Sequence, residues 1–355
     1  MSPRVIVLAP NWLGDAVMAL PAIGDVRRAL PDATLAVAAR GFLAPLFHAV
    51  GGVDEVVELR GRGGLAGVSG WRENAARLAA VRADIVILLP NSFASAWIAR
   101  QARVPERWGY RADLRRGLLT RSVARPHGSR HQSENYRHLV AALGMDAGGP
   151  PLPILAGEEA SARARQMLLD EGCQPGATVV GLAPGAAYGH AKRWPPEMYA
   201  ALIGRINERL GATAVLVGSA GDRSTGAEIE RCLARARVDR TGREAGLVRW
   251  VNLIGRTDLR LAMAVTALCR AFVSNDSGAM HLAAAQGVPV VAIFGPTIER
   301  ETAPLPPGAH TVLTNPVWCR PCMLRECPID HRCMTGITVE RVLEAVASRL
   351  GTVSG

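Results

Sequence analysis

Short runs of consecutive apolar residues recur along the chain, and most are followed by a polar or glycine-containing turn. Such runs are typical of strands buried on both faces, as in parallel sheets. Between them the apolar residues recur at helical spacing, which predicts amphipathic helices. The predicted strands cover residues 4–9, 34–39, 53–59, 84–89, 178–183, 213–217, 251–254, 271–275 and 289–294. The predicted helices include residues 15–30, 43–50, 71–81, 93–100, 158–171, 196–210 and 338–350.

Strands that alternate with helices predict an α/β fold with doubly wound parallel sheets. Residues 144–157 are rich in glycine and proline and lack a helical period, so they are interpreted as a linker. We therefore expect two Rossmann-like domains, residues 1–150 and 151–337, followed by a closing helix in residues 338–355. In such an arrangement the carboxyl ends of both sheets face a ligand-binding cleft.

The chain has 355 residues and a net charge of +10, which favours an anionic partner such as a phosphorylated molecule or an anionic inner-membrane surface. Its arginines are scattered and no nucleic-acid-reading motif is present, so we expect no nucleic-acid partner. The apolar run at the N-terminus is too short for a signal peptide, and no stretch approaches transmembrane length. These features predict a cytoplasmic protein that can attach peripherally to the inner face of the cytoplasmic membrane.

Several common catalytic motifs are missing. The first strand is not followed by G-x-G-x-x-G, and no G-x-x-x-x-G-K-[ST] sequence occurs, which disfavours a dehydrogenase or an NTPase. The G-x-S-x-G nucleophile elbow is also absent.

The loop at residues 183–195, APGAAYGHAKRWP, follows a predicted buried strand and precedes a predicted helix. It contains Lys192, the only lysine among 41 lysine and arginine residues. Lysine is a compact charge on a flexible stem that can approach a phosphate, whereas arginine brings a rigid planar fork. The loop is therefore a candidate phosphate site. The alternative is a lysine that persists by chance on a solvated loop.

Two further strand ends in the second half carry candidate binding residues. After residues 213–217, small residues including Ser219 allow close backbone approach, and Asp222 could accept hydrogen bonds from a ribose or simply cap a helix. After residues 271–275, the start of an alanine-rich helix offers backbone N–H groups to a diphosphate, and Ser277 adds a hydroxyl. His281 follows one turn later. It could contact the ligand, or it could be a histidine that is packed and hydrogen-bonded inside the protein.

In the first half, Asp15 occupies the corresponding turn between a strand and a helix. A carboxylate at this place is a candidate general base that takes a proton from an acceptor hydroxyl. The alternative is a helix-start carboxylate that only complements the helix dipole.

Near the C-terminus, Cys319, Cys322, Cys327 and Cys333 form the pattern C-x2-C-x4-C-x5-C, with His331 inside it. Four thiols in so short a segment predict a structural zinc site, which would staple residues 319–333 without taking part in catalysis. A redox pair, an iron–sulfur site and unligated thiols are the alternatives.

Four segments, NWLGDAVMALPAI, LPNSF, APGAAYGHAKRWP and SNDSGAMHLAAAQGVPVVAIFGPT, together resemble the ADP-heptose:lipopolysaccharide heptosyltransferases of glycosyltransferase family 9, and heptosyltransferase II in particular. The resemblance extends to about Thr297. It implies a two-domain inverting glycosyltransferase of the GT-B type that requires no metal for transfer. The implied donor is ADP-L-glycero-D-manno-heptose, bound mainly by the C-terminal domain. The implied acceptor is the inner core of lipopolysaccharide, bound mainly by the N-terminal domain.

The resemblance also implies roles for individual residues. Asp15 corresponds to the catalytic base, and Lys192 to the lysine that offsets the charge of the leaving group. The predicted acceptor-binding residues are Asn91 and Ser92. The predicted donor-binding residues are Gly185, Lys192, Ser219, Asp222, Asp276, Ser277, Gly278 and His281. A GT-B sugar-nucleotide epimerase and a non-catalytic nucleotide-sugar-binding protein are the alternative functions.

Overall fold

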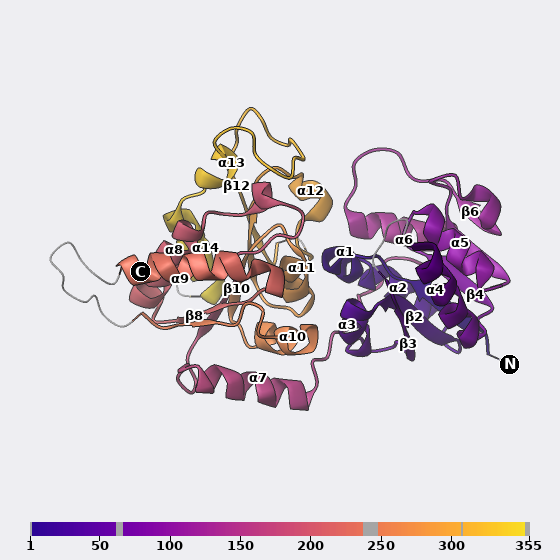
Figure 1. Ribbon diagram of the computed structural model, residues 1–355, viewed down its shortest axis with the longest axis horizontal. Coiled ribbons are helices and arrows are strands. Elements are labelled where there is room, and N and C mark those ends of the chain that lie inside the picture. The colour runs from indigo at the N-terminus through magenta and orange to yellow at the C-terminus, as the bar shows by residue number, and fades with distance from the viewer. Residues whose placement is uncertain (1, 62–66, 237–247, 307, 352–355) are drawn as a thin grey trace. The chain divides into compact units, whose positions relative to one another are not determined.

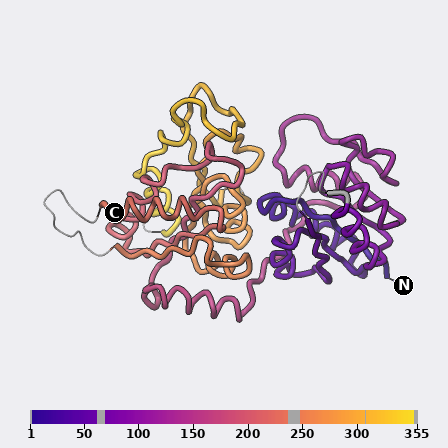
Figure 2. The backbone as a smooth tube through the Cα atoms, in the orientation of Figure 1, coloured from indigo at the N-terminus to yellow at the C-terminus, as the bar shows by residue number. Residues whose placement is uncertain are grey.

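The computed structural model describes residues 2–61, 67–236, 248–306 and 308–351 (Figure 1). The chain divides into two compact units, residues 1–155 and 156–355, and the division falls within the predicted linker segment. Each unit contains one six-stranded sheet in which every pairing is parallel. Figure 2 follows the alternation of strand and helix through each unit. The predicted α/β class with doubly wound parallel sheets is confirmed.

The first sheet has the order β3-β2-β1-β4-β5-β6, so β1 and β4 lie at its centre. Its strands are β1 (Arg4–Leu8), β2 (Thr34–Arg40), β3 (Glu55–Leu59), β4 (Ile85–Leu88), β5 (Glu106–Tyr110) and β6 (Arg121–Val123). The central strands are almost fully buried because helices cover both faces of a parallel sheet. The edge strand β6 has only three residues and two are exposed, so no apolar run marks it in the sequence.

The helices of the first unit are α1 (Leu13–Met18), α2 (Leu20–Ala29), α3 (Ala44–His48), α4 (Gly67–Val81), α5 (Phe93–Gln101) and α6 (Gln132–Ala142). The predicted single helix 15–30 is thus two helices that meet at Ala19. Pro21 lies in the first turn of α2, and its missing N–H cannot continue the hydrogen-bond ladder of α1. The break keeps α1 short, with Asp15 in its first turn.

The second sheet has the order β12-β11-β10-β7-β8-β9. Its strands are β7 (Val179–Ala183), β8 (Thr213–Leu216), β9 (Trp250–Asn252), β10 (Ala271–Asn275), β11 (Val290–Phe294) and β12 (Thr311–Thr314). Strand β10 pairs with both β7 and β11. The loops that follow these three strands therefore meet at one edge of the sheet, although they lie far apart in the sequence.

Helices on both faces of the second sheet form two separate hydrophobic cores. They are α7 (Glu158–Asp170), α8 (Pro196–Leu210), α9 (Arg223–Ala236), α10 (Leu259–Ala267), α11 (Gly278–Ala285), α12 (Glu299–Thr302), α13 (Arg332–Thr335) and α14 (Val339–Leu350). Val180 and Leu182 of β7 join the core beneath α8 and α14, whereas Val179 and Ala183 join the core beneath α7, α10 and α11. Within the described part of the chain, no helix has the length and apolar character required to cross a bilayer.

Candidate active site

The loop after β7 carries Lys192, and the turn after β10 carries Asp276. Because these strands are neighbours, the two side chains meet: Lys192 Nζ lies 2.5 Å from Asp276 Oδ2. The side chains are only 13% and 5% exposed. Lys192 is therefore held in a nearly buried ion pair, which is not the environment of a lysine on a solvated loop.

The Asp276 carboxylate is hydrogen-bonded on both oxygens. Its Oδ2 accepts a bond from Thr297 Oγ1 at 2.7 Å, and its Oδ1 accepts one from Thr302 Oγ1 at 3.4 Å. On the other side of the pair, the Lys192 ammonium lies 4.8 Å from the centre of the Tyr188 ring. The two hydroxyls give the Asp276 carboxylate hydrogen-bond partners in addition to Lys192, and so help to keep it in place.

Asn275, the last residue of β10, connects that strand to both ends of the Lys192 loop. Its Nδ2 donates to Pro184 O at 2.8 Å, and its Oδ1 accepts from Trp194 N and Tyr199 Oη, each at 3.1 Å. The side chain is completely buried. Sequence analysis did not single out Asn275. The available signal was a polar amide residue at the end of the strand sequence AFVSN, in which every residue is buried.

A segment near the C-terminus, residues 320–331, packs along the Lys192 loop, and we call it the bracing segment. Tyr188 Oη donates to Met323 O at 2.8 Å, and Ala191 N donates to Arg325 O at 2.9 Å. His331 Nε2 lies 2.7 Å from Ala191 O, and since a carbonyl only accepts, this nitrogen carries the proton. The brace thus contacts the residue immediately before Lys192.

Arg320, the first residue of the bracing segment, contacts the Asp276 side of the Lys192–Asp276 pair. Its guanidinium donates to Gly295 O at 2.9 Å and to Thr297 O at 3.1 Å, and it forms an ion pair with Glu299 at 2.8 Å. Thr297 in turn donates to Asp276. Residues 320–331 therefore position both partners of the Lys192–Asp276 pair, a role that the cysteine spacing did not suggest.

The structure gives no support to the predicted zinc site. Among the residues it describes, no three or more His, Cys, Asp or Glu side chains are arranged to hold a metal ion. Cys333 is buried in the hydrophobic core, whereas Cys322 is exposed. Burial, with a further contribution from the neighbouring thiols of Cys319, Cys327 and Cys322, raises the pKa of Cys333 to about 11.

The predicted diphosphate turn lies at the start of α11. Ser277 is the N-cap residue, but its side chain makes no capping hydrogen bond and instead lies 3.0 Å from Ser274 Oγ. The N–H groups of the first turn, beginning at Gly278, thus receive no side-chain cap and can bind an anion. His281 is buried within this helix, in agreement with the packed-histidine alternative.

Asp222 caps its own turn. Its Oδ2 accepts bonds from Ser219 N at 3.0 Å and from Ser219 Oγ at 2.7 Å, which is the helix-cap alternative. A Cβ atom at Gly185 would lie 2.3 Å from Asp222 Oδ1, so only glycine allows the loops after β7 and β8 to approach this closely. The predicted ribose contact of Asp222 stays a prediction.

In the first unit, Asp15 lies in the first turn of α1, and Tyr136 approaches it from α6. Tyr136 Oη donates to Asp15 Oδ1 at 3.4 Å. Burial and the nearby Asp15 carboxylate raise the pKa of Tyr136, so its hydroxyl remains protonated and acts as a donor. The carboxylate thus has a partner beyond its own helix, which the interpretation as a simple dipole complement does not require.

The acceptor-side loop after β4 is held by Arg115, which is completely buried. Its Nε donates to Tyr110 O at 2.9 Å, its Nη1 to Ser95 Oγ at 2.9 Å, and its Nη2 to Asn91 Oδ1 at 3.4 Å. Burial lowers the pKa of Arg115 to about 10, so the guanidinium is still charged at neutral pH. Ser92 is the N-cap of α5 and accepts a hydrogen bond from Ser95 N. Sequence analysis missed Arg115 because nothing local separates it from the other arginines.

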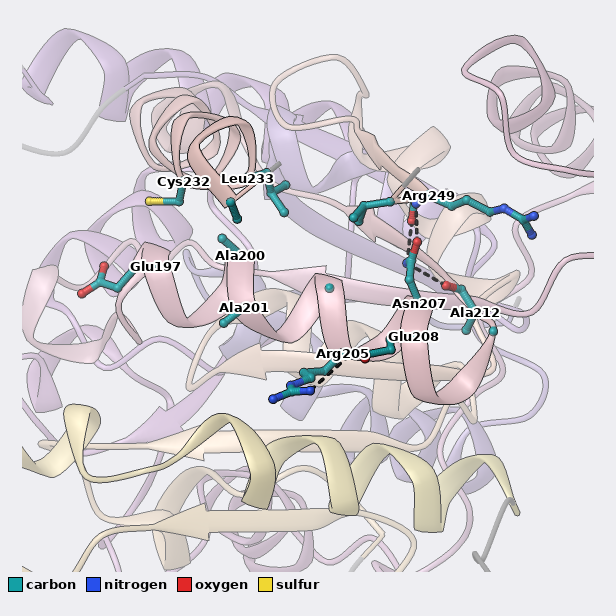
Figure 3. A pocket seen from close by; sticks show the side chains of 14 residues that line it. Glu197, Ala200, Ala201, Arg205, Asn207, Glu208, Ala212, Cys232, Leu233 and Arg249 are labelled. Atoms are coloured by element: carbon teal, nitrogen blue, oxygen red, sulfur yellow. Dashed lines mark hydrogen bonds and ion pairs between the residues drawn. The ribbon is translucent and has the colours of Figure 1, made fainter. Parts of the chain in front are cut away.

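A pocket of about 940 Å³ lies in the second unit, between α8 and α9 (Figure 3). Glu197, Arg205 and Asn207 line it from α8, and Cys232 and Leu233 from α9. None of the predicted site residues lines this pocket. The candidate residues of each unit therefore lie at the carboxyl edge of its own sheet and not in this cavity.

Two doubly wound parallel sheets, one with a carboxylate and the other with a lysine and an uncapped helix start at its carboxyl edge, match the expected GT-B fold. The chain belongs to glycosyltransferase family 9, the heptosyltransferase family, whose model matches residues 71–332. The predicted family and the predicted enzyme class are confirmed.

Individual relatives agree with this assignment. Lipopolysaccharide heptosyltransferase 2 of Salmonella typhimurium is 32% identical over 353 residues, covering 98% of both chains. Lipooligosaccharide heptosyltransferase 2 of Haemophilus ducreyi is 32% identical over 321 residues, covering 85% of this chain and 86% of the relative. The structure of Escherichia coli ADP-heptose lipopolysaccharide heptosyltransferase II matches with a TM-score of 0.80 at 28% identity, covering 98% of both chains.

Proposed function

We propose that this chain transfers L-glycero-D-manno-heptose from ADP-heptose to the inner core of lipopolysaccharide, with inversion at the anomeric carbon. The observation that carries the proposal is the nearly buried Lys192–Asp276 pair beside the uncapped start of α11. The names of the relatives support the donor and the acceptor class. They favour transfer over the epimerase and the non-catalytic alternative.

On the donor side, the diphosphate of ADP-heptose binds at the start of α11. The N–H groups at Gly278 and the Ser277 hydroxyl donate to its oxygens, and Lys192 supplies the positive charge. As the bond between the anomeric carbon and the phosphate oxygen breaks, negative charge grows on ADP. The Lys192 ammonium then shifts towards the phosphate, while Thr297 keeps Asp276 in place.

On the acceptor side, Asp15 takes the proton of the attacking hydroxyl. The acceptor oxygen forms the new bond to the anomeric carbon from the face opposite the departing ADP, which inverts the configuration. Tyr136 donates to Asp15 Oδ1 and so helps to orient the carboxylate that receives the proton. Asn91 and Ser92 contact the acceptor, and the buried Arg115 holds their loop in position.

Replacing the base tests this mechanism. Asp15→Asn and Asp15→Ala enzymes should bind ADP-heptose normally but lose transfer by about 100-fold or more, since a general base contributes on that order. Transfer at a near wild-type rate by Asp15→Ala would remove the assignment of Asp15. Incubation with the donor alone separates the alternatives: epimerised nucleotide sugar indicates an epimerase, and ADP binding without any turnover indicates a binding protein.

Two further features belong to the proposal. Because Lys192 supplies the charge that faces the diphosphate, transfer should continue in the presence of EDTA. A structural zinc held by Cys319, Cys322, Cys327 and Cys333 stays a prediction. Metal analysis of protein purified without added zinc tests it, since metal-free protein with all four thiols titratable contradicts it. We also infer that the enzyme acts in the cytoplasm, at the membrane surface that carries the acceptor.

A further inference from the structure

Four large apolar side chains of the first unit are exposed at one edge of its sheet. Each follows the carboxyl end of a parallel strand: Phe42 after β2, Trp12 after β1, Phe93 after β4 at the first position of α5, and Leu114 after β5. Their exposed fractions are 58%, 60%, 39% and 97%. These four strands are consecutive in the sheet, so the residues follow its carboxyl edge over three inter-strand spacings, about 14 Å. We call them the apolar rim.

Hydrogen bonds join the loops of the rim in pairs. Arg40 Nε donates to Asn11 Oδ1 at 2.8 Å, which links the Phe42 loop to the Trp12 loop. Phe93 N donates to Asp113 Oδ2 at 2.6 Å, which links the Phe93 loop to the Leu114 loop. The two pairs adjoin because β1 pairs directly with β4. The segments that carry the rim residues are thus connected to one another, so the rim is a continuous structural feature.

Leu114 is the most exposed member, and its backbone is strained. Asp113 and Leu114 have φ angles of 47° and 57°, in the left-handed region that side chains other than glycine rarely adopt. The Asp113 bond to Phe93 N on one side and the buried Arg115 on the other hold this conformation. A strained backbone that projects a leucine into solvent is unfavourable for a free surface and points to a binding role.

Positive charge accompanies the rim. Residues 111–130, which follow β5 and include β6, contain six arginines and a single carboxylate, Asp113. One of the six is the buried Arg115, and Arg121 lies within β6 with its guanidinium 5.3 Å from the centre of the Trp108 ring; the other exposed ones are Arg111, Arg116, Arg125 and Arg130. Aromatic and leucine side chains beside arginines match the headgroup region of a bilayer, where rings and apolar tips insert shallowly and guanidinium groups contact lipid phosphates.

We propose that the apolar rim and the exposed arginines of residues 111–130 form a docking surface for an anionic phospholipid bilayer. The inference rests on the proposed function, which places the acceptor in such a bilayer. Asp15 belongs to the same edge, so docking here keeps the proposed base close to the surface from which the acceptor sugars project. The arginines select an anionic surface, and the rim supplies the apolar contact.

The test introduces a negative charge at each of the two ends of the rim, which lie outside the proposed catalytic and acceptor residues. The variants are Phe42→Asp, Leu114→Asp and the double variant, and the control is Leu169→Asp, a 41% exposed leucine on α7 of the second unit. Sedimentation with vesicles of phosphatidylethanolamine and phosphatidylglycerol measures docking. Transfer is measured with acceptor embedded in those vesicles and, in parallel, with an acyl-free core oligosaccharide in solution.

Each rim substitution should weaken vesicle binding by about tenfold, as expected for removing one leucine or phenylalanine from an apolar contact. Transfer to the embedded acceptor should fall in parallel, while transfer to the soluble oligosaccharide stays within twofold and Leu169→Asp behaves as wild type. Unchanged vesicle binding, or an equal loss on the soluble acceptor, overturns the proposal. If wild-type enzyme binds vesicles but transfers to neither acceptor, the proposed function fails while the docking surface stands.

Discussion

Gly189 is the position at which the bracing segment can be separated from the Lys192 loop with the smallest change. Its φ of 163° and ψ of 169° are extended backbone that alanine can adopt, so the substitution introduces no conformational strain. A Cβ atom there, however, would lie 2.3 Å from Arg325 O and 2.8 Å from Arg325 Cα. Both are backbone atoms, and relief requires the two segments to move apart by about 1 Å, to ordinary contact distance.

That movement breaks the contacts that hold the loop. The bond from Ala191 N to Arg325 O is 2.9 Å long, and the contact of His331 Nε2 with Ala191 O is 2.7 Å long. Losing them and relieving the clash should cost about 1–3 kcal/mol of stability in the second unit. Lys192 follows Ala191 directly, and a misplacement of about 1 Å at a catalytic group can cost up to 100-fold in rate. We expect kcat/KM for the donor to fall about 10- to 100-fold in Gly189→Ala.

Steady-state transfer from ADP-heptose measures this effect, with thermal unfolding and circular dichroism as checks on folding. The matched control is Gly204→Ala in α8, where an added Cβ meets nothing within 4 Å. This control should gain about 0.5–1 kcal/mol from helix propensity and keep its activity. A folded Gly189→Ala enzyme whose transfer rate is within twofold of wild type would refute the bracing role.

Three other outcomes are expected. Lys192→Arg should lose about tenfold or more in kcat despite keeping its charge, because a guanidinium does not fit between Tyr188 and Asp276; full activity would contradict the argument from its compact shape. In Tyr136→Phe, the Asp15 carboxylate loses a hydrogen-bond donor that orients it, so kcat/KM should fall about 3- to 10-fold, whereas Tyr110→Phe should leave kcat/KM unchanged. Iodoacetamide at pH 8 should label the exposed Cys322 before the buried Cys333, whose pKa is raised to about 11, and equal labelling rates would contradict the described packing.

The sequence by itself determined the class of fold and most of the central strands. Strands β1, β7 and β10 are continuous apolar runs because a parallel strand is buried on both faces, and this leaves a local signal. The sequence also predicted the turns of the candidate site, since the segments after these strands contain Asp15, Lys192 and Asp276. The family resemblance rests on the same turns.

Local patterns failed where packing decides the outcome. The edge strands β6 and β12 are short and partly exposed, so no apolar run in the sequence predicts them. The thiol spacing predicts a zinc site, but among the described residues no three or more ligating side chains are arranged to hold a metal ion.

Only the tertiary structure decided how the candidate site is held. Lys192 and Asp276 are 84 residues apart in the chain, and Ala191 and His331 are 140 apart. Asn275, Arg115 and His331 form their decisive contacts with backbone carbonyls, whose positions no residue pattern encodes. Periodicity records which face of an element is buried, whereas the partner of a buried polar group is determined by which elements pack together.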